Sequence, residues 1–181
     1  MPTYIAFLRG INVGGNHKVP MVDLKKTLES LGYKNVQTVL ASGNVSFQTT
    51  EKNTTTVAKK IETELKKVFK FEIPTLLYPL EEIQNLFDAN PFKKITVTKE
   101  TRLYITFLRQ PTKTKLTLPW KSPASDFEIL SVTPIAVCSV LTLNPATRSV
   151  DSTKILEQEF SKDVTTRNWN TIEKILQKAN N

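Results

Sequence analysis

Cysteine, histidine and glycine are scarce in this sequence of 181 residues, which holds 1 Cys, 1 His and 5 Gly. One cysteine excludes an intramolecular disulfide and multi-cysteine metal sites, and one histidine excludes a zinc site built on a histidine pair. Cys138 lies in an apolar run, which favours a buried, inert thiol, and His17 lies in a polar loop. The acidic residues form no evident pair. We therefore expect no metal and no cofactor and assign no catalytic residue, so whether the protein is an enzyme stays open.

Long apolar runs are also missing. The longest, Ile135–Leu143, is far too short to span a membrane. The N-terminal run Tyr4–Leu8 has no basic region before it, which argues against a signal peptide. With 39% apolar and 23% charged residues the chain is not of a disordered type. We expect a soluble, cytoplasmic protein.

Strand, helix and turn signals alternate through the first part of the chain. Apolar spacing and turn residues predict strands over 3–8, 35–40, 45–48 and 72–78, a helix opened by Pro20 and stopped by Gly32, and a helix capped by Thr54–Thr56. A tight turn, Ala41–Asn44, joins the second and third strands because Gly and Asn tolerate positive φ. The order β-α-β-β-α-β is that of a ferredoxin-like fold.

The pattern then restarts. Tyr4–Arg9 returns as Tyr104–Arg109 with a single change, Ala6 to Thr106. Further strands are predicted over 126–132 and 135–143, and helices over 152–160 and 169–178. We therefore predict an α+β protein of two ferredoxin-like halves from an internal duplication. The halves are residues 1–78 and 79–181, joined by 79–99 and packed as one unit.

Both faces of the first predicted strand are apolar, with Tyr4, Ala6 and Leu8 on one side and Ile5 and Phe7 on the other. A half-solvated antiparallel strand would show polar residues on one face. We expect one face to be covered by the helices and the other by the second half.

The loop after the first strand, Arg9–Lys18, is the first candidate site and contains three of the five glycines, Gly10, Gly14 and Gly15. Backbone N–H groups between a strand and a helix can hold an anion, and Lys18 can add charge. The loop fails as a P-loop because Asn16-His17 stands where Lys-Ser/Thr is required. The alternative is that the glycines only shape the connection that follows the strand. However, the second copy of the strand, Tyr104–Arg109, is followed by a connection through residues 110–113 that contains no glycine.

The second candidate is the hairpin tip Ser42-Gly43-Asn44. In a ferredoxin-like half this tip lies at the sheet edge where the first strand ends, so we expect it beside the glycine loop. The alternative is a plain turn.

The third candidate is Thr165–Thr171, which we expect at the N-terminus of the last helix, with Arg167 beside its N–H groups and Thr166, Asn168 or Asn170 as a cap. The alternative is that Trp169 and the apolar residues after it only dock the helix while Arg167 pairs with a carboxylate.

Charge is uneven along the chain, whose net charge is +8. The stretch from Lys93 to Lys121 contains eight basic residues and one acidic residue, Glu100. Such a stretch can bind nucleic acid, although a solvated loop is the commoner meaning. An RNA-recognition module has the same strand order and would use Phe7 and Phe47, but its glycine-aromatic signature is absent.

Three motif blocks resemble an uncharacterised, mainly bacterial family, domain of unknown function 1697. They are Tyr4–Gly15 followed by Lys18–Met21, a central block from Leu31-Gly32-Tyr33 through Asn35–Thr38 to Ser42–Phe47, and Thr166–Thr171. The chain departs from the family pattern at Leu40-Ala41, where a bulkier residue and Gln are usual. The resemblance extends over essentially the whole chain and implies a compact protein of two α+β halves. It implies no activity.

Our leading hypothesis is a cleft that binds a small, phosphate-bearing anion. Ten residues are predicted to line it: Arg9, Asn12, Gly14, Gly15, Lys18, Ser42, Gly43, Asn44, Arg167 and Asn168. Arg9 is the weakest of them because it recurs as Arg109. The alternatives are nucleic-acid binding by residues 93–121 and a non-catalytic scaffold for a protein partner. The sequence does not indicate an oligomeric state.

Overall fold

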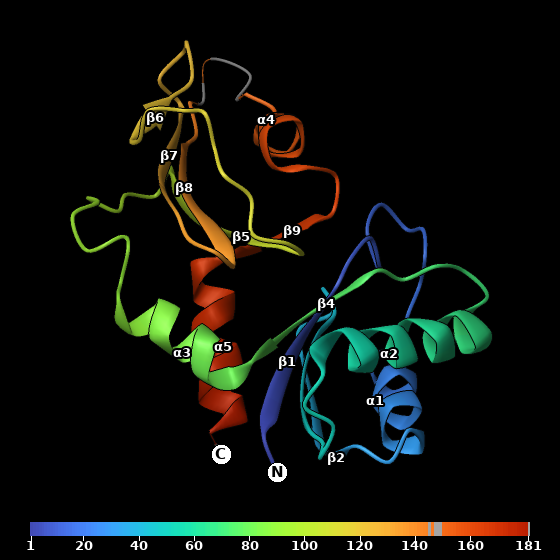
Figure 1. Cartoon of the computed structure of the whole chain (residues 1–181). Helices are drawn as coiled ribbons and strands as arrows, with labels where there is room; N and C mark the ends of the chain where they lie inside the picture. Colours follow the sequence, from blue (N-terminus) through green and yellow to red (C-terminus); the bar gives the residue numbers. More distant parts are fainter. Residues whose placement is uncertain (145, 147–149, 181) are drawn as a thin grey trace. The chain divides into compact units, whose positions relative to one another are not determined.

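The computed structural model describes residues 1–144, 146 and 150–180, and within them the chain is mixed α+β, with five helices and two antiparallel sheets (Figure 1). The elements are β1 (Thr3–Leu8), α1 (Met21–Ser30), β2 (Lys34–Val39), β3 (Asn44–Gln48), α2 (Thr54–Phe69), β4 (Thr75–Pro79), α3 (Leu80–Asp88), β5 (Thr101–Leu108), β6 (Trp120–Lys121), β7 (Phe127–Val132), β8 (Ala136–Thr142), α4 (Ser152–Phe160), β9 (Val164–Asn168) and α5 (Trp169–Ala179).

The chain divides into two units, and the division differs from the predicted one. The first unit comprises Met1–Asp88 and Ile172–Asn181, and the second comprises Ala89–Thr171. The segment 79–99 was expected only to join two halves, but its residues 80–88 form α3. This helix buries Ile83 and Leu86, so it has an apolar face and packs on β1 and β4. We therefore count α3 and most of α5 with the first unit.

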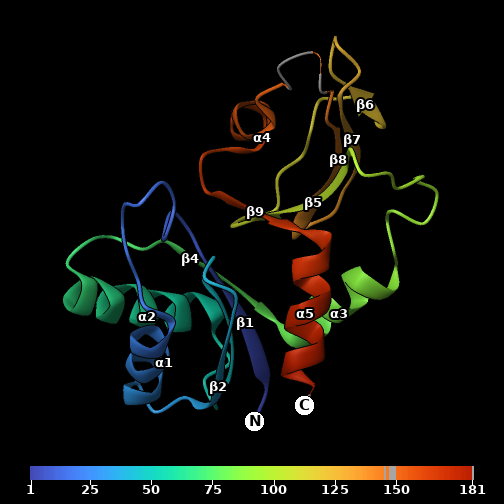
Figure 2. The same cartoon turned by 180° about the vertical axis from the view of Figure 1, so that it is seen from behind.

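The sheet of the first unit has the strand order β2-β3-β1-β4, with antiparallel pairing throughout. One face, which carries Tyr4, Ala6 and Leu8, forms a core with the apolar stripes of α1 and α2. The opposite face carries Ile5 and Phe7 and lies on the side of α3 and α5 in both views (Figures 1 and 2). Both faces of β1 are thus buried, as its apolar alternation predicted. Phe7 and Phe47 are fully buried and offer no surface to RNA.

The helix boundaries follow local signals. Pro20 precedes α1, where its fixed φ and missing N–H suit a helix start, and Gly32 follows the last turn at φ +85°. The start of α2 corrects the prediction: the cap is Asn53, whose side chain accepts a hydrogen bond from the N–H of Thr56, and not the threonine run.

The sheet of the second unit has the strand order β6-β7-β8-β5-β9. Leu156 and Phe160 of α4 pack on its apolar face. The strand β9 was not predicted, because Thr165–Asn168 was expected to be the cap of the last helix. It pairs with β5, and the hydroxyls of Thr106 and Thr166 lie 2.9 Å apart across the two strands.

Candidate functional site

The glycine loop forms a small hairpin of its own. The N–H of Asn16 donates to the carbonyl of Val13 at 3.1 Å, and the N–H of Asn12 donates to the carbonyl of His17 at 3.1 Å. Gly14 and Gly15 have φ of +60° and +79°, which a type I′ turn requires at both central residues. Residues 13–18 are exposed, so the turn presents its backbone to solvent.

Asn12 ties this hairpin to the rest of the first unit. Its Oδ1 accepts a hydrogen bond from the N–H of Val19 at 2.8 Å, and its Nδ2 donates to the carbonyls of Val19 at 3.0 Å and Ala41 at 2.8 Å. Ala41 belongs to the β2–β3 turn. The predicted proximity of the glycine loop and that turn is therefore observed, and Asn12 itself makes the connection.

Gly43 allows the turn to pack against the loop. A Cβ atom at this position would lie 2.7 Å from Ile11 Cδ1 and 2.9 Å from Leu8 Cβ, and φ is +78°. Asn44 is fully buried, and its Nδ2 donates to the carbonyl of Val39 and to Ser42 Oγ. The second positive φ of the turn belongs to Leu40 and not to Asn44, which corrects the sequence-based expectation.

Two side chains of the loop differ in their surroundings. The ring of His17 stacks on Phe71 with centroids 4.4 Å apart, and its Nδ1 lies 3.2 Å from the carbonyl of Gly10. Lys18 is exposed and has no ion pair among the described residues. The backbone N–H of Arg9 donates to the carbonyl of Pro74 at 2.9 Å.

The first turn of α1 begins directly after Lys18 and Val19. Its N-cap residue, Pro20, supplies no side-chain hydrogen bond, whereas Asn53 caps α2 and Asp151 caps α4. A helix N-terminus carries partial positive charge on N–H groups that have no partner within the helix. The start of α1 therefore offers N–H groups to an anion, in a turn that also carries the carboxylate of Asp23.

Arg167 and Asn168 lie in the second unit, on β9. Arg167 is in the strand and lies two residues before α5 begins at Trp169, so the expected position next to a helix start and an unpredicted strand coincide. It is 8% exposed, and its guanidinium donates to Thr165 Oγ1 at 2.8 Å and to the carbonyl of Thr166 at 2.9 Å. Burial lowers the pKa of Arg167 to about 10. Asn168 is exposed at the end of the strand.

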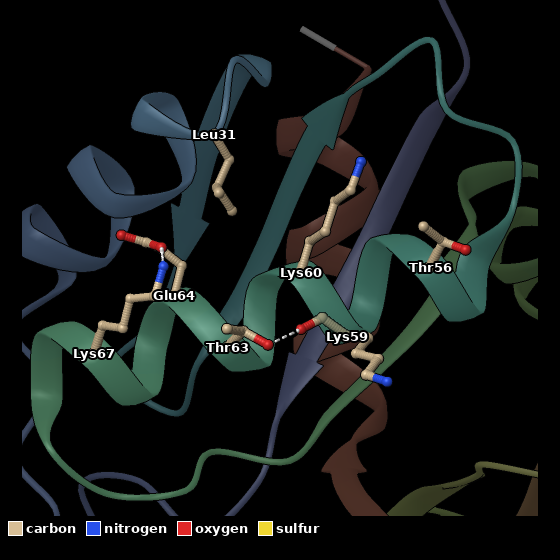
Figure 3. Close-up of a pocket in the computed structure, with 7 residues that line it drawn as sticks. All are labelled: Leu31, Thr56, Lys59, Lys60, Thr63, Glu64 and Lys67. Carbon is tan, nitrogen blue, oxygen red and sulfur yellow. Dashed lines mark hydrogen bonds and ion pairs between the residues drawn. The ribbon is translucent and has the colours of Figure 1, made fainter.

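Two adjoining hollows in the first unit were not predicted. The first, about 420 Å³, lies between Leu31 and the outer face of α2, where Thr56, Lys59, Lys60 and Thr63 line it and Lys67 pairs with Glu64 (Figure 3). The second, about 620 Å³, shares Leu31 and Lys60 with it. We call the second the Tyr33 hollow; Tyr33, Lys34, Thr49 and Glu51 also line it. None of the ten predicted site residues lines either hollow.

Tyr33 is the unusual residue of this region. Its ring stacks on Phe47 with centroids 4.6 Å apart, and its buried hydroxyl has no hydrogen-bond partner among the described residues. Burial, and to a lesser degree the charge of Glu51, raises the pKa of Tyr33. The motif Leu31-Gly32-Tyr33 was visible in the sequence, but only the fold shows that this hydroxyl is unpartnered.

The basic segment of the second unit is partly neutralised. Lys99 pairs with Glu100 at 3.6 Å and Lys121 with Glu128 at 3.7 Å. Exposure alternates through residues 111–120, so Lys113 and Lys115 are exposed while Leu116 and Leu118 pack on the core.

Other classes of site find little support. Cys138 is buried, as predicted, and burial raises the pKa of its thiol. The described residues contain no group of three or more His, Cys, Asp or Glu arranged to hold a metal ion. No helix in the described ranges is both long and apolar enough to cross a membrane.

The fold is thus that of a mixed α+β protein with two antiparallel sheets. The chain belongs to the family described as protein of unknown function DUF1697, whose model matches residues 1–137. This range contains the first two motif blocks and ends before the third. A solved structure, that of the conserved bacterial protein SP0830 from Streptococcus pneumoniae, is similar with a TM-score of 0.73 and 22% identity, over 98% of each chain. The search of curated proteins found no match.

Proposed function

We propose that the first unit binds a small, phosphate-bearing ligand at the glycine loop and the first turn of α1. The observation that carries this proposal is the start of α1, which has no side-chain cap and lies next to Lys18, an exposed lysine without an ion pair in the part of the chain that the structure describes. Backbone N–H groups at a helix start and a nearby cation form an established type of phosphate site.

The predicted residues take two different roles in this proposal. Lys18 and the exposed backbone of Gly14 and Gly15 contact the ligand, with Ser42 at the margin. Asn12, Gly43 and Asn44 build the support, because their polar groups or their missing Cβ are used within the fold. The ligand-contacting set is thus smaller than the sequence suggested, and Arg167 and Asn168, which belong to the second unit, are not needed for it.

The test is a thermal-shift and calorimetric titration with inorganic phosphate, a sugar phosphate and a nucleotide, at low and moderate salt. A ligand at 100 times its Kd stabilises the folded state by about 2.7 kcal/mol, which is readily measured. Lys18→Ala should weaken binding roughly tenfold or more, because a charge-assisted hydrogen bond contributes about 1.5–3 kcal/mol. Lys26→Ala, an exposed lysine on α1, is the matched control. Equal affinities for both variants would show that the loop is not the site.

Nucleic-acid binding by the second unit is the rival proposal, supported by the outward-facing Lys113 and Lys115. Affinity for single strands should then fall with salt at a log–log slope of about −0.7 for each phosphate contact. Replacing both lysines by alanine should reduce that slope by about 1.4. An unchanged slope, measured by fluorescence anisotropy with a labelled oligonucleotide, would exclude this segment.

We also infer that both units are ferredoxin-like and descend from an internal duplication. Matching β1, β2, β3 and β4 with β5, β7, β8 and β9 gives the same strand order in both sheets. Two backbone hydrogen bonds recur in this alignment. The N–H of Leu8 donates to the carbonyl of Gly43, and the N–H of Leu108 donates to the carbonyl of Ile135. The backbone hydrogen bond donated by Arg9 likewise recurs at Arg109. In the second unit the extended segment after β5 takes the place of α1.

A further inference from the structure

The Tyr33 hollow lies at the other end of the first sheet from the glycine loop. Lys34 begins β2 and Thr49 follows β3, whereas the loop follows the C-terminal end of β1. Because β1 is antiparallel to β3, with Thr3 opposite Gln48 and Phe7 opposite Asn44, the two regions are separated by the length of the strands. A ligand in this hollow would therefore occupy a site distinct from the one proposed above.

The hollow has a cationic lining with few counter-charges. Lys34 and Lys60 are exposed, and neither has an ion pair within the described residues. The carboxylate of Glu51 also lines the hollow, but its Oε1 accepts a hydrogen bond from the N–H of Asn53 at 2.9 Å. Its charge still acts on Tyr33, whose pKa it raises, so the lining sets one carboxylate against two lysines. The two lysines are thus available to an anion.

The hydroxyl of Tyr33 supplies a second, independent indication of a ligand. A buried hydroxyl without a partner is costly, and natural proteins retain few of them. Tyr33 is 7% exposed, and its stack on Phe47 fixes the ring and hence the position of the hydroxyl. Phenylalanine would fill the same place in the core without that cost. The tyrosine is explained if a ligand oxygen completes its hydrogen bond.

We propose that the Tyr33 hollow binds a small phosphate monoester, with Lys34 and Lys60 contacting the phosphate and Tyr33 donating to a ligand oxygen. A volume of about 620 Å³ suits a molecule of metabolite size. The adjoining hollow along α2 shares Leu31 and Lys60, so it gives room for the rest of the molecule beside Lys59 and Thr63 (Figure 3). Because the hydroxyl of Tyr33 is buried, a ligand that reaches it must displace neighbouring side chains.

The test compares wild type with Tyr33→Phe and Lys60→Ala, by thermal shift and calorimetry with glucose 6-phosphate, AMP, inorganic phosphate and citrate. Without ligand, Tyr33→Phe should melt about 2–6 °C higher than wild type, because the unpartnered hydroxyl is gone. With a phosphate monoester, it should bind about tenfold more weakly, and Lys60→Ala at least tenfold more weakly. Citrate distinguishes general oxyanion binding from phosphate recognition.

Two controls separate this proposal from structural effects and from the loop site. Tyr4→Phe alters another tyrosine of the same core, whose ring centroid lies 6.2 Å from that of Phe47. Tyr4 lines neither hollow, so this variant should leave ligand affinity unchanged. All variants are compared in a Lys18→Ala background, which weakens the proposed loop site, so that the affinity measured is that of the Tyr33 hollow. The proposal is overturned if neither glucose 6-phosphate nor AMP binds the Lys18→Ala parent, or if citrate binds as tightly as the phosphate esters. It is also overturned if Lys60→Ala binds as tightly as that parent, or if Tyr33→Phe and Tyr4→Phe behave alike.

Discussion

Replacing Gly43 by alanine is expected to lower the free energy of unfolding by about 2–5 kcal/mol. Two effects add. A residue with a Cβ at φ +78° costs about 1–2 kcal/mol, and forcing an atom into a packed core costs about 1–3 kcal/mol more. The new methyl group would meet Ile11 Cδ1 at 2.7 Å and Leu8 Cβ at 2.9 Å. Urea denaturation followed by circular dichroism measures the loss.

Gly14→Ala is the matched control, because it makes the same chemical change at another left-handed residue. Its φ is +60°, but a Cβ there has nothing within 4 Å. Only the backbone cost of about 1–2 kcal/mol is expected. The difference between the two variants therefore measures the contact between the β2–β3 turn and the loop. If both lost the same stability, that contact would contribute nothing.

The sequence was sufficient for the features that depend on local signals. Pro20, Gly32 and the spacing of Leu24 and Leu28 predicted α1, and the apolar alternation of β1 predicted a strand that is buried on both faces. Topology alone then placed the β2–β3 turn beside the glycine loop. These inferences succeed because they need only helical and strand periodicity and one strand order.

The roles of individual polar residues could not be predicted in the same way. Asn12 and Asn44 were expected to face a ligand, but each bonds to a backbone carbonyl that the fold brings to it. Arg167 lies just before α5, as expected, but the strand β9 that contains it was missed, because β9 is short and polar and only its pairing with β5 makes it a strand. Tyr33 is ordinary in sequence, and its unpartnered hydroxyl is a property of the packed core.

Asn12→Ala tests whether this residue supports the loop or contacts the ligand. Its side chain makes three hydrogen bonds to backbone groups, each contributing about 0.5–1.5 kcal/mol. Alanine also tolerates φ of +55° less well than asparagine. We expect a loss of about 2–4 kcal/mol in unfolding free energy, measured by urea denaturation. Asn12→Asp should lose stability as well, because it keeps the acceptor for the N–H of Val19 but turns a carboxylate oxygen toward the carbonyls of Val19 and Ala41.

The control is Asn16→Ala, at the exposed tip of the same hairpin, which should change stability by less than about 0.5 kcal/mol. A large loss for Asn12→Ala beside a small one for Asn16→Ala means that the loop is held in one conformation from its base. A fixed loop presents its backbone N–H groups and Lys18 to an anion without an ordering cost at binding. Unchanged stability of Asn12→Ala with weaker phosphate binding would instead return Asn12 to the ligand-contacting residues.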